Sequence, residues 1–147
     1  MEDYLVISAD LRHLTEAEAD DFVDAAAGLG LDVDDLPPHL GVSAEVVVLA
    51  STTLGAVCAK LIDIAGGSAA QKLWDLIRRL LHRQAGPQGI EDVQQRITFV
   101  WDEPARRDGP LATAAMITVC QSIAAIPDGT VLNWDPKAGQ WRHIPPI

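Results

Sequence analysis

The chain has 147 residues, which is the usual length of one domain, and we expect a single globular domain over residues 1–147. Its formal net charge is −10, from 21 acidic and 11 basic residues, so it lacks the positive surface on which nucleic-acid binding depends. Two cysteines are too few for a disulfide framework and indicate a reducing, cytoplasmic compartment. The longest apolar stretch, residues 46–59, carries no charge but is too short to span a membrane, so we expect no membrane partner.

The negative charge is concentrated in the first third of the chain. Residues 1–45 contain 12 acidic residues and one base, Arg12, whereas residues 46–147 are almost neutral. Such a segment is either a solvated face that aids solubility or a surface for a basic partner. Both interpretations stay open at this point.

The N-terminal elements are a strand and a capped helix. Residues 4–9 are aliphatic and β-branched, which predicts a short strand. Thr15 and Glu18 form a capping box, which predicts a helix from residue 16 to about residue 27. Its solvent side carries Glu16, Asp20, Asp21 and Asp24. Prolines and clustered aspartates predict a loop over residues 32–42.

The middle of the chain is apolar and then amphipathic. Three consecutive valines favour a buried strand over residues 45–50, although one buried helix through this region stays possible. A helix is expected from Thr52 to the glycines at 66 and 67, where we expect a hinge more than an anion site. Residues 69–82 predict an amphipathic helix whose polar face carries Arg78, Arg79 and Arg83.

The C-terminal part predicts a strand over residues 96–101, a loop, and a helix from Pro110 to about Ile126. Residues 130–134 and 140–143 flank a turn and predict a β-hairpin with Trp134 opposite Trp141. Together these patterns predict an α/β (α+β) fold in two layers, with a mixed sheet of four or five strands covered by three or four helices.

Motifs for phosphate or metal binding do not fit their required spacing. The chain has no phosphate loop and no complete dinucleotide fingerprint. The run Asp32, Asp34 and Asp35 near His39 lacks the third acid and the glycine of a calcium loop. We therefore predict no metal ion and no cofactor.

Catalytic motifs are missing as well. His13, His82 and His143 stand alone in the sequence, and we predict no catalytic residue. Cys58 and Cys120 lie in apolar runs, which predicts buried, reduced thiols. A small enzyme that gathers dispersed His and Asp side chains in its fold stays open as an alternative.

One stretch of the chain resembles a known class of proteins. A glycine- and alanine-rich helical middle broken by GG, an amphipathic helix ending in LIRRLLHR, and the strand RITFVWD follow one another over residues 45–101. This order is similar to the small effector-associated constant components of bacterial conflict and defence systems. The resemblance implies a non-catalytic accessory protein that works beside effectors or proteases, and it carries over no site residues.

We therefore expect a protein that acts by binding another protein, such as an effector encoded nearby. The candidate contact residues are Arg78, Arg79 and Arg83 on one helix and Glu16, Asp20 and Asp24 on another. These two sets could also meet each other in a homodimer. The alternative is an acidic immunity or inhibitor protein that covers a basic toxin with residues 16–35. The four tryptophans are expected first in the core, and second as a partly exposed ridge for a partner.

Overall fold

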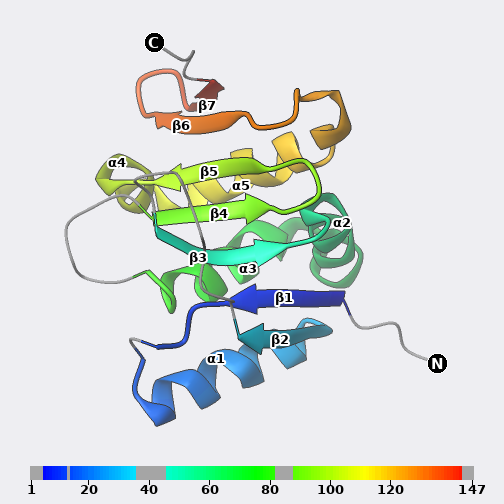
Figure 1. Ribbon diagram of the computed structural model, residues 1–147, viewed down its shortest axis with the longest axis vertical. Coiled ribbons are helices and arrows are strands. Elements are labelled where there is room, and N and C mark those ends of the chain that lie inside the picture. The colour runs from blue at the N-terminus through cyan, green and yellow to red at the C-terminus, as the bar shows by residue number, and fades with distance from the viewer. Residues whose placement is uncertain (1–4, 13, 36–45, 82–87, 144–147) are drawn as a thin grey trace.

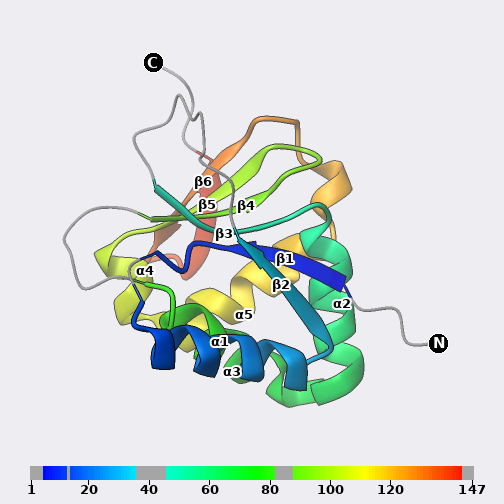
Figure 2. The ribbon, with the colours of Figure 1, turned by 60° about the horizontal axis from the view of Figure 1, so that its bottom comes forward.

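The fold is an α/β arrangement built on one mixed sheet, seen in a computed structural model that describes residues 5–12, 14–35, 46–81 and 88–143. Within these residues, seven strands pair in the order β2-β1-β3-β4-β5-β6-β7 (Figure 1). Helices α1, α2, α3 and α5 lie on one side of this sheet (Figure 2). The strands are β1 (Leu5–Ala9), β2 (Leu31–Asp35), β3 (Val46–Ser51), β4 (Gln88–Asp92), β5 (Ile97–Trp101), β6 (Val131–Asp135) and β7 (Gln140–His143). The α-helices are α1 (Glu16–Gly28), α2 (Leu54–Ala65), α3 (Ala69–Arg78), α4 (Glu103–Arg107) and α5 (Gly109–Cys120).

The predicted class, the two layers and the hairpin are confirmed, but the strand count was too low. The described sheet has seven strands instead of four or five, because β2 and β4 were not recognised. Among the described helices, four have ten or more residues and α4 has five, in a segment predicted to be a loop. No helix in the described part of the chain has the length and apolar character to cross a membrane.

The N-terminal unit consists of two parallel strands joined through α1. The predicted capping box forms, since Glu18 N donates to Thr15 Oγ1 at 3.1 Å and Thr15 N donates to Glu18 Oε1 at 2.9 Å. Phe22 and Ala26 of α1 are fully buried in the core. The loop prediction for residues 32–42 is wrong at residues 32–35, which belong to β2, and residues 36–42 lie outside the described ranges.

The middle unit begins with β3 and ends with the parallel strand β4. Residues 46–51 are a strand, which decides the ambiguity between strand and helix. A 3₁₀ turn over residues 66–68 joins α2 to α3, so these glycines lie between two helices. The side chain of Ser68 does not cap α3.

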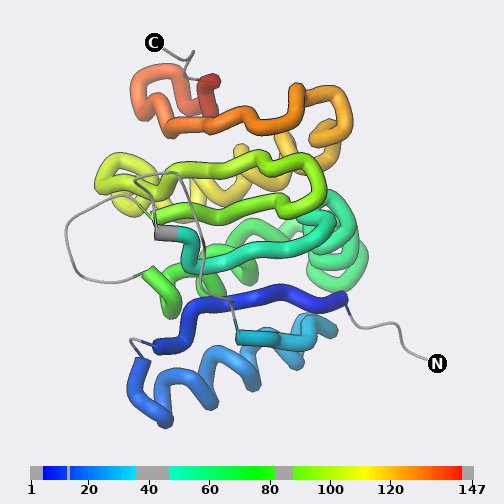
Figure 3. The backbone as a smooth tube through the Cα atoms, viewed as in Figure 1, coloured from blue at the N-terminus to red at the C-terminus, as the bar shows by residue number. Residues whose placement is uncertain are grey.

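The C-terminal unit joins the parallel strands β5 and β6 through α4 and α5 and ends in the hairpin β6–β7. Asp102 explains α4, because its Oδ1 accepts from Ala105 N at 3.3 Å and caps the helix. Gly139 has a φ of 65°, as the predicted hairpin turn requires. Figure 3 shows this hairpin and the unit β1–α1–β2 at opposite ends of the sheet.

Four tryptophans from α3, β5, β6 and β7 form one aromatic cluster in the core. Trp74 stacks on Trp101 with ring centroids 5.7 Å apart, and Trp141 lies 5.4 Å from both Trp101 and Trp134. Trp134 and Trp141 are register partners, as predicted. Trp101 is fully buried and Trp74 is half-buried, so core packing is confirmed and an exposed aromatic ridge is not observed in the described residues.

Candidate functional site

The acidic side chains of α1 and β2 gather at one end of the sheet. β2 is an edge strand, and α1 lies next to it (Figures 1 and 2). We call these eight exposed side chains the acidic edge: Glu16, Glu18, Asp20, Asp21, Asp24, Asp32, Asp34 and Asp35. No basic residue occurs between residues 16 and 35, so the edge carries one sign of charge.

The sequence of β2 explains how its carboxylates reach this surface. Leu31 is buried and Val33 is half-buried beside β1, while Asp32 and Asp34 alternate with them and are exposed. Asp32 and Asp34 therefore point to the sheet face opposite the helices. The acidic edge thus includes carboxylates of α1 on the helix side of the sheet and carboxylates of β2 on its other face. The alternation of apolar and acidic residues was the available sequence signal, and the following prolines obscured it.

Two of the eight carboxylates have structural partners. Glu18 belongs to the capping box, and Arg79 Nε donates to Asp21 Oδ2 at 2.8 Å. Within the described ranges, no ion pair or hydrogen bond is formed by the other six side chains. Most of the charge of the acidic edge is therefore not compensated by the described part of the chain.

The arginines predicted to form one cluster make different contacts. Arg79 bonds to Asp21 and also donates through Nη1 to the Asp75 carbonyl oxygen at 2.6 Å. Arg78 Nε lies 3.2 Å from Asp75 Oδ1, and its side chain is 53% exposed. Arg83 lies outside the described residues. Arg79 thus makes within one chain the kind of contact that was expected with the acidic helix of a second copy. Of the two described arginines in this cluster, Arg78 is the more exposed.

A small cavity of about 260 Å³ lies between α1 and α3 beside this ion pair. Its lining residues are Ala25, Gly28, Leu29, Lys72, Asp75, Leu76 and Arg79. The exposed side chain of Lys72 adds a cation to the lining of this cavity.

Buried polar side chains in the described residues serve the fold. Asp10 accepts from Arg12 Nε and Nη2 at 3.0 Å, and this hydrogen bond raises the pKa of Arg12. Asp92 accepts from two backbone N–H groups. Arg106 donates to Gln88 Oε1 at 2.6 Å, and burial lowers the pKa of Arg106. These side chains hold strand ends and helix starts together.

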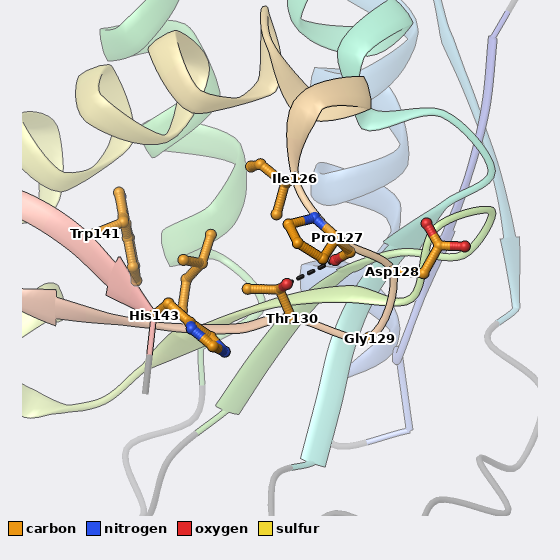
Figure 4. A pocket seen from close by; sticks show the side chains of 8 residues that line it. Ile126, Pro127, Asp128, Gly129, Thr130, Trp141 and His143 are labelled. Atoms are coloured by element: carbon orange, nitrogen blue, oxygen red, sulfur yellow. Dashed lines mark hydrogen bonds between the residues drawn. The ribbon is translucent and has the colours of Figure 1, made fainter. Parts of the chain in front are cut away.

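A larger pocket of about 590 Å³ lies beside the C-terminal hairpin (Figure 4). Its walls are Ile126, Pro127, Asp128, Gly129, Thr130, Leu132, Trp141 and His143. Thr130 Oγ1 donates to the Pro127 carbonyl oxygen at 2.6 Å, and Trp141 Nε1 donates to the Ala112 carbonyl oxygen at 2.9 Å. Figure 4 shows Asp128 and His143 on either side of Thr130, so they do not form an acid–base pair.

The remaining candidates of the enzyme alternative are not brought together in the described part of the chain. His13, His39 and His82 lie outside the described residues. Among the described residues, no group of three or more His, Cys, Asp or Glu side chains is placed to hold a metal ion. Cys58 and Cys120 are buried and free, as predicted.

No protein-family model, curated protein or solved structure matches this chain. The resemblance to accessory components of conflict systems therefore stays a prediction.

Proposed function

We propose that this protein is a non-catalytic interaction component that binds a basic protein through its acidic edge. The observation that carries this proposal is the convergence of two acidic segments, residues 16–24 and 32–35, on one edge of the fold. Most of these carboxylates have no partner in the described chain. A basic surface would supply the missing counter-charges.

The physical advantage of such a surface is fast and selective association. Like charges held on one edge repel each other, and a partner of opposite sign relieves this repulsion. Complementary charge also steers the encounter and disfavours acidic competitors. Because exposed charges are screened over about 10 Å at 0.1 M salt, binding through this edge should weaken steeply as salt is added.

The resemblance over residues 45–101 supports an accessory role beside an effector of a bacterial conflict system. The alternative function, an immunity or inhibitor protein for a basic toxin, uses the same acidic edge. The two differ in the consequence of binding, because an inhibitor must abolish the activity of its partner. An added readout of partner activity separates them.

The test compares three forms of the full chain as bait in lysate from cells that carry the gene. The edge variant carries Asp20→Asn, Asp24→Asn and Asp34→Asn. The matched control carries Asp63→Asn, Glu103→Gln and Asp128→Asn, which remove the same charge from exposed positions elsewhere.

We expect the wild type and the control to retain the same basic protein, and the edge variant to lose it. Raising the salt concentration from about 0.05 to 0.5 M should release that protein from the wild type and from the control, because screening shortens the reach of each charge. Equal retention by the edge variant and the wild type would show that the acidic edge is not the binding surface.

A further inference from the structure

The two cysteines lie at the crossing of α2 and α5. Cys58 is in the second turn of α2, and Cys120 is the last residue of α5. Their exposed fractions are 1% and 2%, and both are free thiols. These two positions belong to different units of the sheet, far apart in the sequence.

The backbones approach closely at this crossing. A Cβ atom at Gly55 would lie 3.0 Å from the Cys120 carbonyl oxygen. Cys58 is three residues after Gly55, so it lies on the same face of α2, about 4.5 Å further along the axis. Helical side chains lean toward the N-terminus of their helix, which brings the Cys58 thiol back over the turn that contains Gly55. The thiols of Cys58 and Cys120 therefore meet.

The electrostatics of the pair agree with this geometry. A hydrogen bond with the Cys58 side chain, together with burial, raises the pKa of the Cys120 thiol. The carboxylate of Asp92 acts in the same direction. The close approach of α2 to α5 at Gly55 and the burial of both thiols place the two sulfur atoms where a small movement brings them to bonding distance.

We propose that Cys58 and Cys120 form a modification site, at which a small hydroperoxide converts the two thiols into a reversible intramolecular disulfide that ties α2 to α5. This inference is independent of the acidic edge, because it concerns residues inside the core.

The chemistry proceeds in two balanced steps. One thiol gives up its proton and attacks a peroxide oxygen, which forms a sulfenic acid and releases water. The second thiol then attacks the sulfenic sulfur, the S–S bond forms, and the hydroxyl leaves as a second water. The two thiols are oxidised by two electrons, and one hydrogen peroxide molecule is reduced to two water molecules.

The position of the pair determines how it reacts. Because the thiolate is the attacking species, the raised pKa of Cys120 makes the reaction slow at neutral pH. Because burial excludes glutathione and other large reagents, the oxidant has to be as small as hydrogen peroxide. The bond closes the loop between residues 58 and 120, and chain-entropy arguments predict that the melting midpoint rises by roughly 10 °C.

The test treats the reduced full chain with hydrogen peroxide over several hours, removes the peroxide with catalase, and alkylates free thiols in denaturant. We expect two alkylated cysteines before oxidation and none after it, with a mass loss of about 2 Da for the two hydrogens removed. Peptide mapping should show Cys58 linked to Cys120, and dithiothreitol should restore both thiols. The oxidised protein should also melt at the higher temperature.

Cys58→Ser and Cys120→Ser are the matched controls, since each removes one thiol. Each variant should gain oxygen atoms on the remaining cysteine and show no rise in melting midpoint. Mapping of the wild type decides the question even if a variant fails to fold. The proposal is overturned if the wild type gains oxygen without a crosslink, if it forms disulfide-linked dimers, or if both thiols remain alkylatable after treatment.

Discussion

Replacing Asp92 by alanine should destabilise this protein more than any exposed acidic substitution. Asp92 ends β4 and is 2% exposed. Its Oδ2 accepts from Leu54 N, the first residue of α2, at 2.8 Å, and its Oδ1 accepts from Gln95 N at 3.0 Å. One carboxylate therefore holds the start of α2 and the turn between β4 and β5.

The magnitude follows from what each bond does. Losing the cap of a helix costs about 1 kcal/mol, and leaving a buried N–H without an acceptor costs about 1–3 kcal/mol. We therefore expect Asp92→Ala to lower the free energy of unfolding by about 2–4 kcal/mol. Asp92→Asn keeps one acceptor oxygen and should cost about half as much, because its amide nitrogen cannot accept from the second N–H.

The assay is urea unfolding followed by tryptophan fluorescence. A loss of about 3 kcal/mol lowers the midpoint by roughly 1 M or more, given the usual slope for a domain of this size. Asp128→Ala is the control, because Asp128 is exposed and should change stability by less than about 0.5 kcal/mol. If Asp92→Ala unfolds at the same midpoint as this control, the two bonds contribute nothing beyond what water supplies.

Three further predictions concern the core, the ion pair and the thiol. Gly109→Ala places a Cβ atom against the indole ring of Trp74, closer than van der Waals contact allows, and should cost about 1–3 kcal/mol in the same urea assay. A double-mutant cycle of Arg79→Ala and Asp21→Ala should give a coupling of about 0.5 kcal/mol that disappears in 1 M salt, since this pair is partly exposed. A hydrogen bond and burial raise the pKa of the Cys120 thiol in the folded chain. Above about pH 9, the unfolded chain therefore loses a thiol proton that the folded chain keeps. Stability should then fall above about pH 9, by up to about 1.4 kcal/mol per pH unit, and Cys120→Ser should flatten this fall in pH-dependent unfolding.

Local patterns predicted the parts of the fold that depend on local contacts. The capping box of α1 joins residues three apart, and the turn of the final hairpin fixes the pairing of Trp134 with Trp141. Strand β4 escaped prediction because its sequence, QGIED, contains one large apolar residue, Ile90. Strand β4 forms because it pairs with β3 on one side and β5 on the other, and this pairing cannot be seen in the sequence of β4 itself.

The sequence predicted which acidic residues are exposed, but it did not predict how they are arranged in space. The exposed acids of α1 followed from helical periodicity, but their union with residues 32–35 depends on the parallel pairing of β1 and β2. Arg79 and Asp21 are 58 residues apart, and nothing in the sequence indicates that they meet. The contact of the two thiols is of the same kind, because each was predicted to be buried but their meeting depends on the crossing of α2 and α5.

Helix α1 and strand β2 each have one face of buried apolar side chains and another face of exposed acidic side chains. Phe22 and Leu31 are at most 1% exposed, while the carboxylates of α1 and β2 point outward. Burial of the apolar side chains supplies the stability of this unit, and the exposed charges work against it by repelling one another. Since repulsion of this kind does not help the unit to fold, the proposed role in recognition would account for its concentration on one edge. Neutralising the edge should therefore separate binding from stability, which makes this surface the place where the function of the protein can be tested without disturbing its fold.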